Sequence, residues 1–115
     1  MRIEVRGRNF EVTDDLREAV SKRFARVGKQ VSELATLDVE LREERNPAIR
    51  ESQIVEATLR LKGKTLRASE ASPEMLHSIH EAAEDIRRQV KRHRELRRSR
   101  WRARRSKAQL RNRPA

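Results

Sequence analysis

The sequence lacks cysteine and tyrosine altogether, and it has only three glycines and three prolines in 115 residues. The absence of cysteine excludes disulfide bonds, thiolate metal sites and thiol nucleophiles. No apolar run approaches the roughly 18 residues that a membrane-spanning helix requires. The segment Met1–Val5 does not contain the apolar core of a signal peptide, so a cytoplasmic protein is the default expectation.

Hydrophobic residues are also scarce. Leu, Ile, Val and Phe together account for 25 of the 115 residues, which is just above the fraction below which a chain is expected to be disordered. The length fits one domain and not two. We therefore predict a single domain with a small and mostly aliphatic core.

Positive charge is concentrated at the C-terminal end of the chain. The formal net charge is +11. Residues 1–86 contain 15 Lys and Arg against 17 Asp and Glu, whereas residues 87–115 contain 14 Lys and Arg and one acid, Glu95. A basic segment of this kind indicates a nucleic acid or an anionic membrane surface as a partner, and composition alone does not choose between them.

The hydrophobic pattern predicts the fold. Apolar and polar residues alternate in four segments, which predicts half-buried strands at residues 2–8, 37–42, 55–62 and 66–69. Helical spacing predicts one helix over about residues 14–31 and a second that begins at Ser72-Pro73. The expected fold is an α+β two-layer sandwich of order β-α-β-β-β-α, with a four-stranded sheet and two helices on one face. The first two strands are expected to be parallel with a right-handed crossover, and the later strands to form an antiparallel meander.

Turn and cap residues define the ends of these elements. Thr13 is the predicted N-cap of the first helix. Gly63-Lys64 is expected to form a two-residue hairpin turn with glycine first. The apolar stripe of the second helix fades after Leu96. We therefore expect a domain over residues 1–96, a helix end at about residues 96–100, and a basic arm over residues 97–115 without fixed structure in the free protein.

Catalytic and metal sites are supported only weakly. Gly63-Lys64-Thr65 matches the end of a phosphate-binding loop, but Thr58 stands where that loop requires glycine. One helix face carries four potential metal ligands, for which a solvated polar face is the better explanation: His77, His80, Glu81 and Glu84. The acids of the strands are better explained by cross-strand ion pairs with neighbouring arginines: Glu4, Glu40 and Glu56 with Arg6, Arg42 and Arg60. We predict no catalytic residue, no metal, no cofactor and no small-molecule substrate.

The basic residues of the two helices are the most informative feature. They lie off the apolar stripes, towards the C-terminal part of each helix: Arg23, Arg26 and Lys29 on the first, and Arg87, Arg88, Lys91, Arg92 and Arg94 on the second. Two such helices in one layer would form a cationic ridge, and arginine suits bidentate contact with phosphate. A solvated charged face is the alternative, and it accounts poorly for so many surplus charges.

The aromatic residues bear on how a nucleic acid would be recognised. With no tyrosine and two phenylalanines, a sheet that stacks bases is disfavoured, so we expect the backbone and shape of the nucleic acid to be read. Trp101 lies between Arg100 and Arg102. It could stack on a base, or it is an incidental tail residue or a packing contact.

Two parts of the chain resemble a known family. The run Arg6–Thr13, followed by Leu16-Arg17-Glu18 and Val20, resembles the start of the ribosome hibernation-promoting factors, also called ribosome-associated inhibitor or protein Y. The family's last strand and second helix are similar to Leu66-Arg67-Ala68, Glu74-Met75, Ile79 and Ile86–His93. The resemblance covers about residues 2–95 and agrees with the order of elements derived above.

The resemblance implies a translation inhibitor that is not an enzyme and that protects idle ribosomes during stress or stationary phase. Such a protein binds the small ribosomal subunit (30S, and within 70S) between head and body, contacts 16S rRNA, and blocks mRNA and the A- and P-site tRNAs. The resemblance places the rRNA contacts on the basic surface of both helices, which here holds the eight cations named above.

The sequence departs from the family at three positions of the second helix: Leu76 replaces a common tyrosine, His80 a common aspartate, and Asp85 an often basic residue. A long form of the family adds a C-terminal domain that dimerises ribosomes, and the sequence does not decide between a short form and part of a long one. The alternative functions are a general double-stranded-RNA-binding module and a membrane-surface protein. The latter is disfavoured because residues 91–109 offer only Leu96 and Trp101 as large apolar residues.

Overall fold

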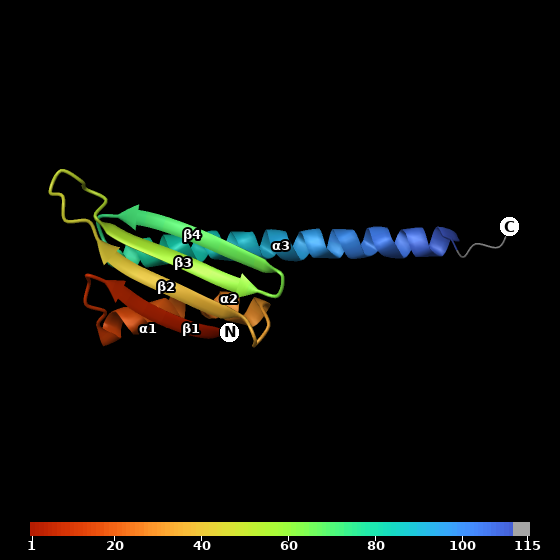
Figure 1. Cartoon of the computed structure of the whole chain (residues 1–115), viewed down its shortest axis with the longest axis horizontal. Coiled ribbons are helices and arrows are strands. Elements are labelled where there is room, and N and C mark those ends of the chain that lie inside the picture. Colours follow the sequence, from red (N-terminus) through yellow and green to blue (C-terminus); the bar gives the residue numbers. More distant parts are fainter. Residues whose placement is uncertain (112–115) are drawn as a thin grey trace.

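Four strands form one sheet in the order β1-β2-β3-β4 in the computed structural model, which describes residues 1–111 (Figure 1). The strands are β1 (Arg2–Arg8), β2 (Thr36–Glu43), β3 (Gln53–Leu61) and β4 (Lys64–Ser72). The pairing is confirmed, since β1 and β2 are parallel and β2, β3 and β4 form an antiparallel meander. β4 is longer than the predicted strand 66–69 and matches β3 in length.

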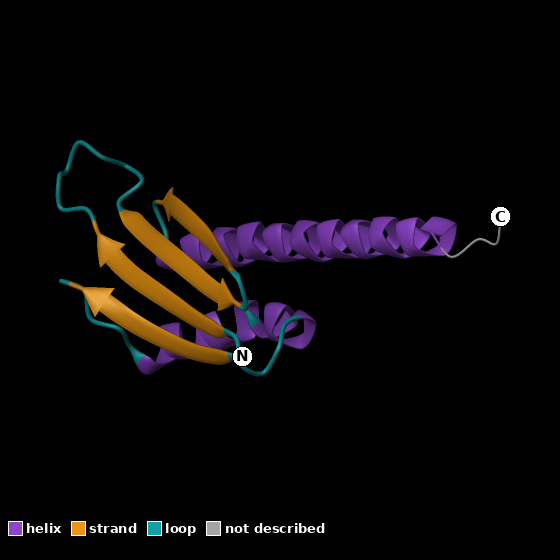
Figure 2. Cartoon of the chain, turned by 45° about the vertical axis from the view of Figure 1, so that its right-hand side comes forward, coloured by secondary structure: helices purple, strands orange, loops and turns teal. Residues whose placement is uncertain are grey.

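Helices lie on one face of this sheet: α1 (Asp14–Arg23), α2 (Ala25–Gln30) and α3 (Met75–Arg111) (Figure 2). The predicted N-cap Thr13 accepts a hydrogen bond from the Leu16 amide at 3.3 Å. The prediction of one helix over residues 14–31 is wrong in one respect, because the backbone at Phe24 separates α1 from α2. Phe24 is fully buried and continues the apolar stripe, so hydrophobic periodicity gives no sign of the break.

The start of α3 is tied to the sheet by buried hydroxyl groups. The helix begins at Met75, two residues later than predicted, although the Ser72 hydroxyl still accepts a hydrogen bond from the Glu74 amide at 3.3 Å. Ser78 is fully buried and donates to the Gln53 carbonyl oxygen at 2.7 Å. These bonds fix the first turn of α3 against β3.

The far end of α3 corrects a prediction. The helix continues to Arg111, so an end at residues 96–100 is wrong, and residues 97–111 are helical rather than without fixed structure. The remaining part of the predicted arm, residues 112–115, lies outside the described residues. Arginine has nearly the helix propensity of leucine, and no glycine or proline interrupts residues 75–111. The 37 residues of α3 make a helix about 55 Å long, and Figure 1 shows it projecting well beyond the sheet.

The core lies between the sheet and the helices. β2 and β3 turn six side chains inward that are at most 1% exposed: Leu37, Val39, Leu41, Val55, Ala57 and Leu59. The helices supply fully or almost fully buried residues against them, among them Val20, Phe24, Val27, Ile79, Ile86 and Val90. The core is therefore small and mostly aliphatic, as the composition predicted.

The β3–β4 turn differs from the prediction by one residue. Leu61 pairs with Lys64, so the loop residues are Lys62 and Gly63, and glycine is second rather than first. Gly63 has a φ of +74°, a conformation that glycine adopts without a steric penalty. Lys64 is consequently the first residue of β4. Alternate residues of a strand point to the same face, so Lys64 faces the helical layer, as the buried Leu66 and Ala68 do.

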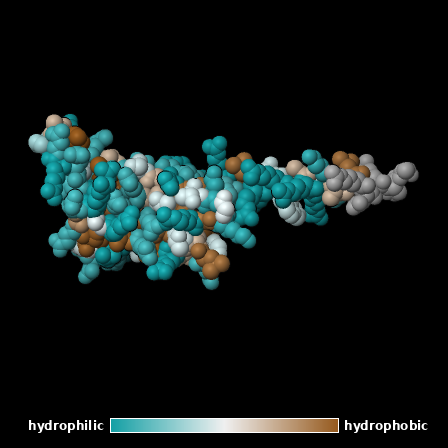
Figure 3. All heavy atoms as spheres, viewed as in Figure 1, coloured by the Kyte–Doolittle hydropathy of each residue, from teal (hydrophilic) through white to brown (hydrophobic). Residues whose placement is uncertain are grey.

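The other face of the sheet is charged. Ion pairs join neighbouring strands on it: Arg6 with Glu40 at 3.3 Å, Arg42 with Glu56 at 2.9 Å, and Arg60 with Asp38. The expected cross-strand pairs are confirmed for Glu40 and Glu56, whereas Glu4 pairs with Arg2 on its own strand. Figure 3 shows that the surface on this side is largely hydrophilic, with hydrophobic residues in isolated groups.

Candidate nucleic-acid interface

The eight basic residues predicted to contact rRNA all lie on the helical layer. Arg23 ends α1, Arg26 and Lys29 lie on α2, and the other five lie on α3. Seven of the eight are exposed and Arg87 is half-buried. Most of these charges are therefore accessible to a partner.

Five of these cations lie along the junction between α1–α2 and α3. Arg23 and Leu76 line one hollow at this junction, and Gln30 and Arg94 line a second. Arg26 lies one turn before Gln30 and shares its face of α2. Arg87 and Lys91 precede Arg94 by seven and three residues, which is the spacing of one helix face. We call Arg23, Arg26, Arg87, Lys91 and Arg94 the interhelical cations.

The structure separates the other three predicted residues from this set. Lys29 lies two residues after Val27, which is buried, and therefore on the outer side of α2. Arg88 lies two residues from both Ile86 and Val90, which are buried, and therefore on the outer side of α3. Arg92 lines a hollow on the opposite flank of α3, against the β3–β4 hairpin. The eight cations therefore do not form the predicted single ridge. Five are interhelical cations, and only Arg92 of the other three lies on the opposite flank of α3.

Glu84 reduces the charge of one interhelical cation. Its carboxylate accepts a hydrogen bond from Arg87 at 2.9 Å. This bond, with the positive charges of Arg87, His80 and Arg88, lowers the pKa of Glu84 against the opposing effect of burial. Within residues 1–111, no ion pair engages Lys91 or Arg94, so these two carry their full charge into any contact.

Asp85, one of the departures from the family, faces away from the interhelical cations. Its carboxylate accepts a hydrogen bond from Gln89 at 3.2 Å, and Gln89 also donates to the Arg67 carbonyl oxygen on β4 at 2.7 Å. Asp85 therefore lies on the β4 side of α3. Its negative charge does not oppose the interhelical cations directly.

The projecting part of α3 carries eight cations and no acid over residues 97–111. The Arg105 guanidinium lies 5.3 Å from the centre of the Trp101 ring, a cation–π contact between residues one turn apart. Trp101 is still 60% exposed. It lies five residues after Leu96 and nine before Leu110, so it occupies a different side of the helix from both. The projecting part of α3 therefore lacks the continuous apolar face that a membrane-surface helix requires. No helix within residues 1–111 is long and apolar enough to cross a membrane.

The potential metal ligands of α3 and the segment Gly63-Lys64-Thr65 do not form a metal site or a phosphate-binding loop in the part of the chain that the structure describes. His77 and Glu81 approach to 3.9 Å, and the described residues contain no group of three or more His, Asp or Glu placed to hold a metal ion. Gly63-Lys64-Thr65 joins two strands, so it is a hairpin and not the strand-to-helix loop that cradles phosphates.

Comparison with known proteins gives a consistent set of relatives. The family model for "Sigma 54 modulation protein / S30EA ribosomal protein" matches residues 3–98. The chain is 30% identical over 99 residues to the ribosome hibernation promoting factor of Pseudomonas putida, an alignment that covers 86% of this chain and 92% of the relative.

Solved structures agree. The N-terminal domain of Thermus thermophilus protein Y superposes with a TM-score of 0.68 at 28% identity, covering 81% of this chain and 99% of that domain. A ribosomal subunit interface protein from Coxiella burnetii has a TM-score of 0.70 at 19% identity, covering 83% and 99% of the two chains, which shows likeness of fold alone. The family match ends at residue 98 and leaves most of the projecting part of α3 outside.

Proposed function

The chain belongs to the sigma 54 modulation protein / S30EA ribosomal protein family, and on this premise we propose that it is a ribosome hibernation factor that binds the small ribosomal subunit. The resemblance stated from the sequence agrees with this family. We propose further that its target is 16S rRNA at the decoding region, in 30S subunits and in 70S ribosomes of the cytoplasm.

The interhelical cations carry this proposal. Five cations from three helices line one surface, and only Arg87 among them has a carboxylate partner within residues 1–111. Phosphate groups of folded RNA bind such a surface through charge-assisted hydrogen bonds, in which arginine contributes two parallel donors. The scarcity of aromatic residues favours recognition of backbone and shape over base stacking.

The proposed mechanism is occupancy rather than catalysis. A folded domain held at the decoding region by phosphate contacts occupies the space that mRNA and the A- and P-site tRNAs would need. Neither a chemical step nor a cofactor is needed for this effect. Translation stops while the protein is bound, and the occupied ribosome is protected.

The test is a charge reversal on the interhelical surface. Arg26 and Lys91 are exposed, so R26E/K91E should fold like the wild type while losing small-subunit binding in co-sedimentation. R45E/R50E is the matched control, because it makes the same change of charge at two exposed residues of the β2–β3 loop. We expect the wild type and the control to bind 30S, to protect A- and P-site rRNA from chemical probing and to inhibit translation in vitro.

The competing function, a general double-stranded-RNA binder, gives a different result. It predicts that the wild type binds free duplex RNA as tightly as 30S and leaves the decoding region reactive. A decoding region that stays reactive to chemical probing while the protein is bound would contradict the proposal. Equal 30S binding by R26E/K91E and R45E/R50E would also contradict it.

A further inference from the structure

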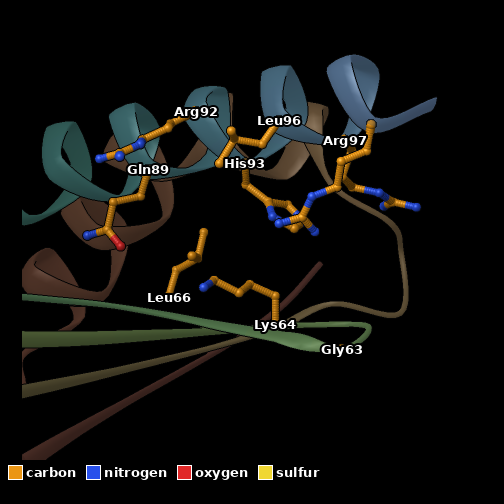
Figure 4. A pocket seen from close by; sticks show the side chains of 9 residues that line it. Gly63, Lys64, Leu66, Gln89, Arg92, His93, Leu96 and Arg97 are labelled. Atoms are coloured by element: carbon orange, nitrogen blue, oxygen red, sulfur yellow. The ribbon is translucent and has the colours of Figure 1, made fainter. Parts of the chain in front are cut away.

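The β3–β4 hairpin and α3 enclose a hollow on the flank of α3 that faces away from α1 and α2. It has a volume of about 390 Å³. The hairpin contributes Lys64, and α3 contributes Arg92, His93, Arg97 and Arg100. Figure 4 shows the side chains of Lys64, His93 and Arg97 pointing into the space between the strand and the helix. We call this space the hairpin hollow.

The positive charges of the hairpin hollow have no counter-charge in the described part of the chain. No carboxylate is among its lining residues. Within residues 1–111, the ion pairs involve none of Lys64, Arg92, Arg97 and Arg100. Four cations that line one hollow without a partner give it a positive potential, which favours an anion within it.

His93 responds to this accumulation of charge. Burial lowers the pKa of its imidazole below the ordinary value, and the positive charges of Arg97, Lys64 and Arg100 lower it further. On its other side His93 lines the hollow at the α2–α3 junction, whose charged residues are also basic: Arg60, Lys62, Arg94 and Arg97. Of these, Arg60 is paired with Asp38.

We propose that the hairpin hollow is a binding site for one phosphate group, supplied either by an RNA backbone or by a free phosphate compound. The ammonium group of Lys64 approaches from the strand, and the guanidinium groups of Arg97 and Arg100 approach from the helix. A doubly or singly charged phosphate offers several acceptor oxygens, which suits donors that converge from two sides. Arg92 belongs to this site rather than to the interhelical cations.

Phosphate binding at this site is coupled to protonation of His93. An anion in the hollow offsets the three cations that disfavour imidazolium, so the pKa of His93 rises when phosphate binds and the imidazole becomes a further donor. The coupling is reciprocal, so a phosphodiester, whose single charge does not change in this pH range, should bind more tightly as the pH falls through the pKa of His93.

The experiment is an NMR pH titration of the histidine side chains of the full chain, with and without sodium pyrophosphate at matched sodium chloride. His77 and His80 lie outside the hollow and serve as internal references. The test variant K64Q/R100Q removes one cation from the hairpin and one from α3. The control variant K62Q/R98Q makes the same change at neighbouring positions that do not line the hollow.

In the wild type and in K62Q/R98Q, pyrophosphate should raise the pKa of His93 saturably and leave His77 and His80 unchanged. In K64Q/R100Q, the pKa of His93 should be higher before any addition. Its pyrophosphate affinity should fall at least about tenfold, since two charge-assisted contacts are lost. An unresponsive His93 in the wild type, or an equal loss in both double variants, would overturn the proposal.

A second titration with an RNA duplex identifies the source of the phosphate. A response of His93 to the duplex that disappears in K64Q/R100Q identifies an RNA backbone, and a response to pyrophosphate alone identifies a free phosphate compound. The RNA source rests on the proposed function, whereas the pyrophosphate titration uses no ribosome. R26E/K91E separates the two, because it should lose 30S binding and keep the pyrophosphate response.

Discussion

Removal of residues 101–115 shortens α3 and tests what its projecting part contributes. The deletion removes six cations and no acid: Arg102, Arg104, Arg105, Lys107, Arg111 and Arg113. The buried residues of α3 end at Val90, and Leu96 is already 48% exposed. We therefore expect the free energy of unfolding to change by less than about 0.5 kcal/mol. Affinity for RNA should fall, because each lost phosphate contact flattens the plot of log K against log salt concentration by about 0.7–0.9, or about 4–5 for six contacts.

The assay is fluorescence anisotropy with a labelled RNA duplex, repeated with 30S subunits, at several salt concentrations. R102Q/R104Q/K107Q is the matched control for helix length, because glutamine has nearly the helix propensity of arginine and lysine. It should flatten the plot by about half as much as the deletion. An unchanged slope for the deletion would show that the projecting helix does not contact RNA. A shift of several degrees in its melting temperature would show that this helix packs on the domain.

Three smaller changes test the core, a buried hydrogen bond and an ion pair. Leu59 is fully buried, so Leu59→Ala should lower the free energy of unfolding by about 2–5 kcal/mol in urea titration; a loss under about 1 kcal/mol would contradict the assignment of the inner face. Ser78→Ala leaves the Gln53 carbonyl oxygen without its hydroxyl donor and should cost about 1–3 kcal/mol, whereas Ser21→Ala, at an exposed site of α1, should be nearly neutral. Since Arg87 lowers the pKa of Glu84 in the folded state, the stability from this carboxylate is fully present above its ordinary pKa of 4.5 and is lost as the pH falls through the lower folded value. Glu84→Gln should therefore flatten the acid limb of the stability profile, and an unaltered limb would rule out this linkage.

Much of the fold is predictable from the sequence because each strand has one apolar and one charged face. Alternation in Leu37–Leu41 and Val55–Leu59 identifies both the strands and their inner faces. The turn between β3 and β4 is misplaced by one residue because Lys62 and Lys64 are both polar and flank the same glycine. The break at Phe24 is invisible for a related reason, since a buried residue continues the apolar stripe across it.

The candidate site is predictable only as a set of charges. The helical pattern of the sequence identifies the eight cations. Which of them lie between the helices and which lie beside β4 depends on the side of α3 that faces α1–α2, and tertiary packing determines that side. Lys64 carries no local signal of function. It reaches the hairpin hollow because the strand register points it at a helix that begins eleven residues later. The extent of α3 is not predictable from its apolar stripe, because the stripe fades after Leu96 while the helix propensity of the arginines that follow continues the helix.

The length of α3 has a consequence for the kinetics of encounter. Residues 97–111 carry eight cations and no acid and extend over about 22 Å at the rise of an α-helix. At physiological ionic strength, electrostatic screening acts over about 8 Å. Charges on the compact domain are thus felt only near its surface, whereas the helix carries its own charges nearly three screening lengths outward. We expect a polyanion that collides with the tip to be held there before the domain is oriented. In that case the helix enlarges the target for association and makes the association rate steeply dependent on salt, while the contacts of the domain determine how long the complex lasts.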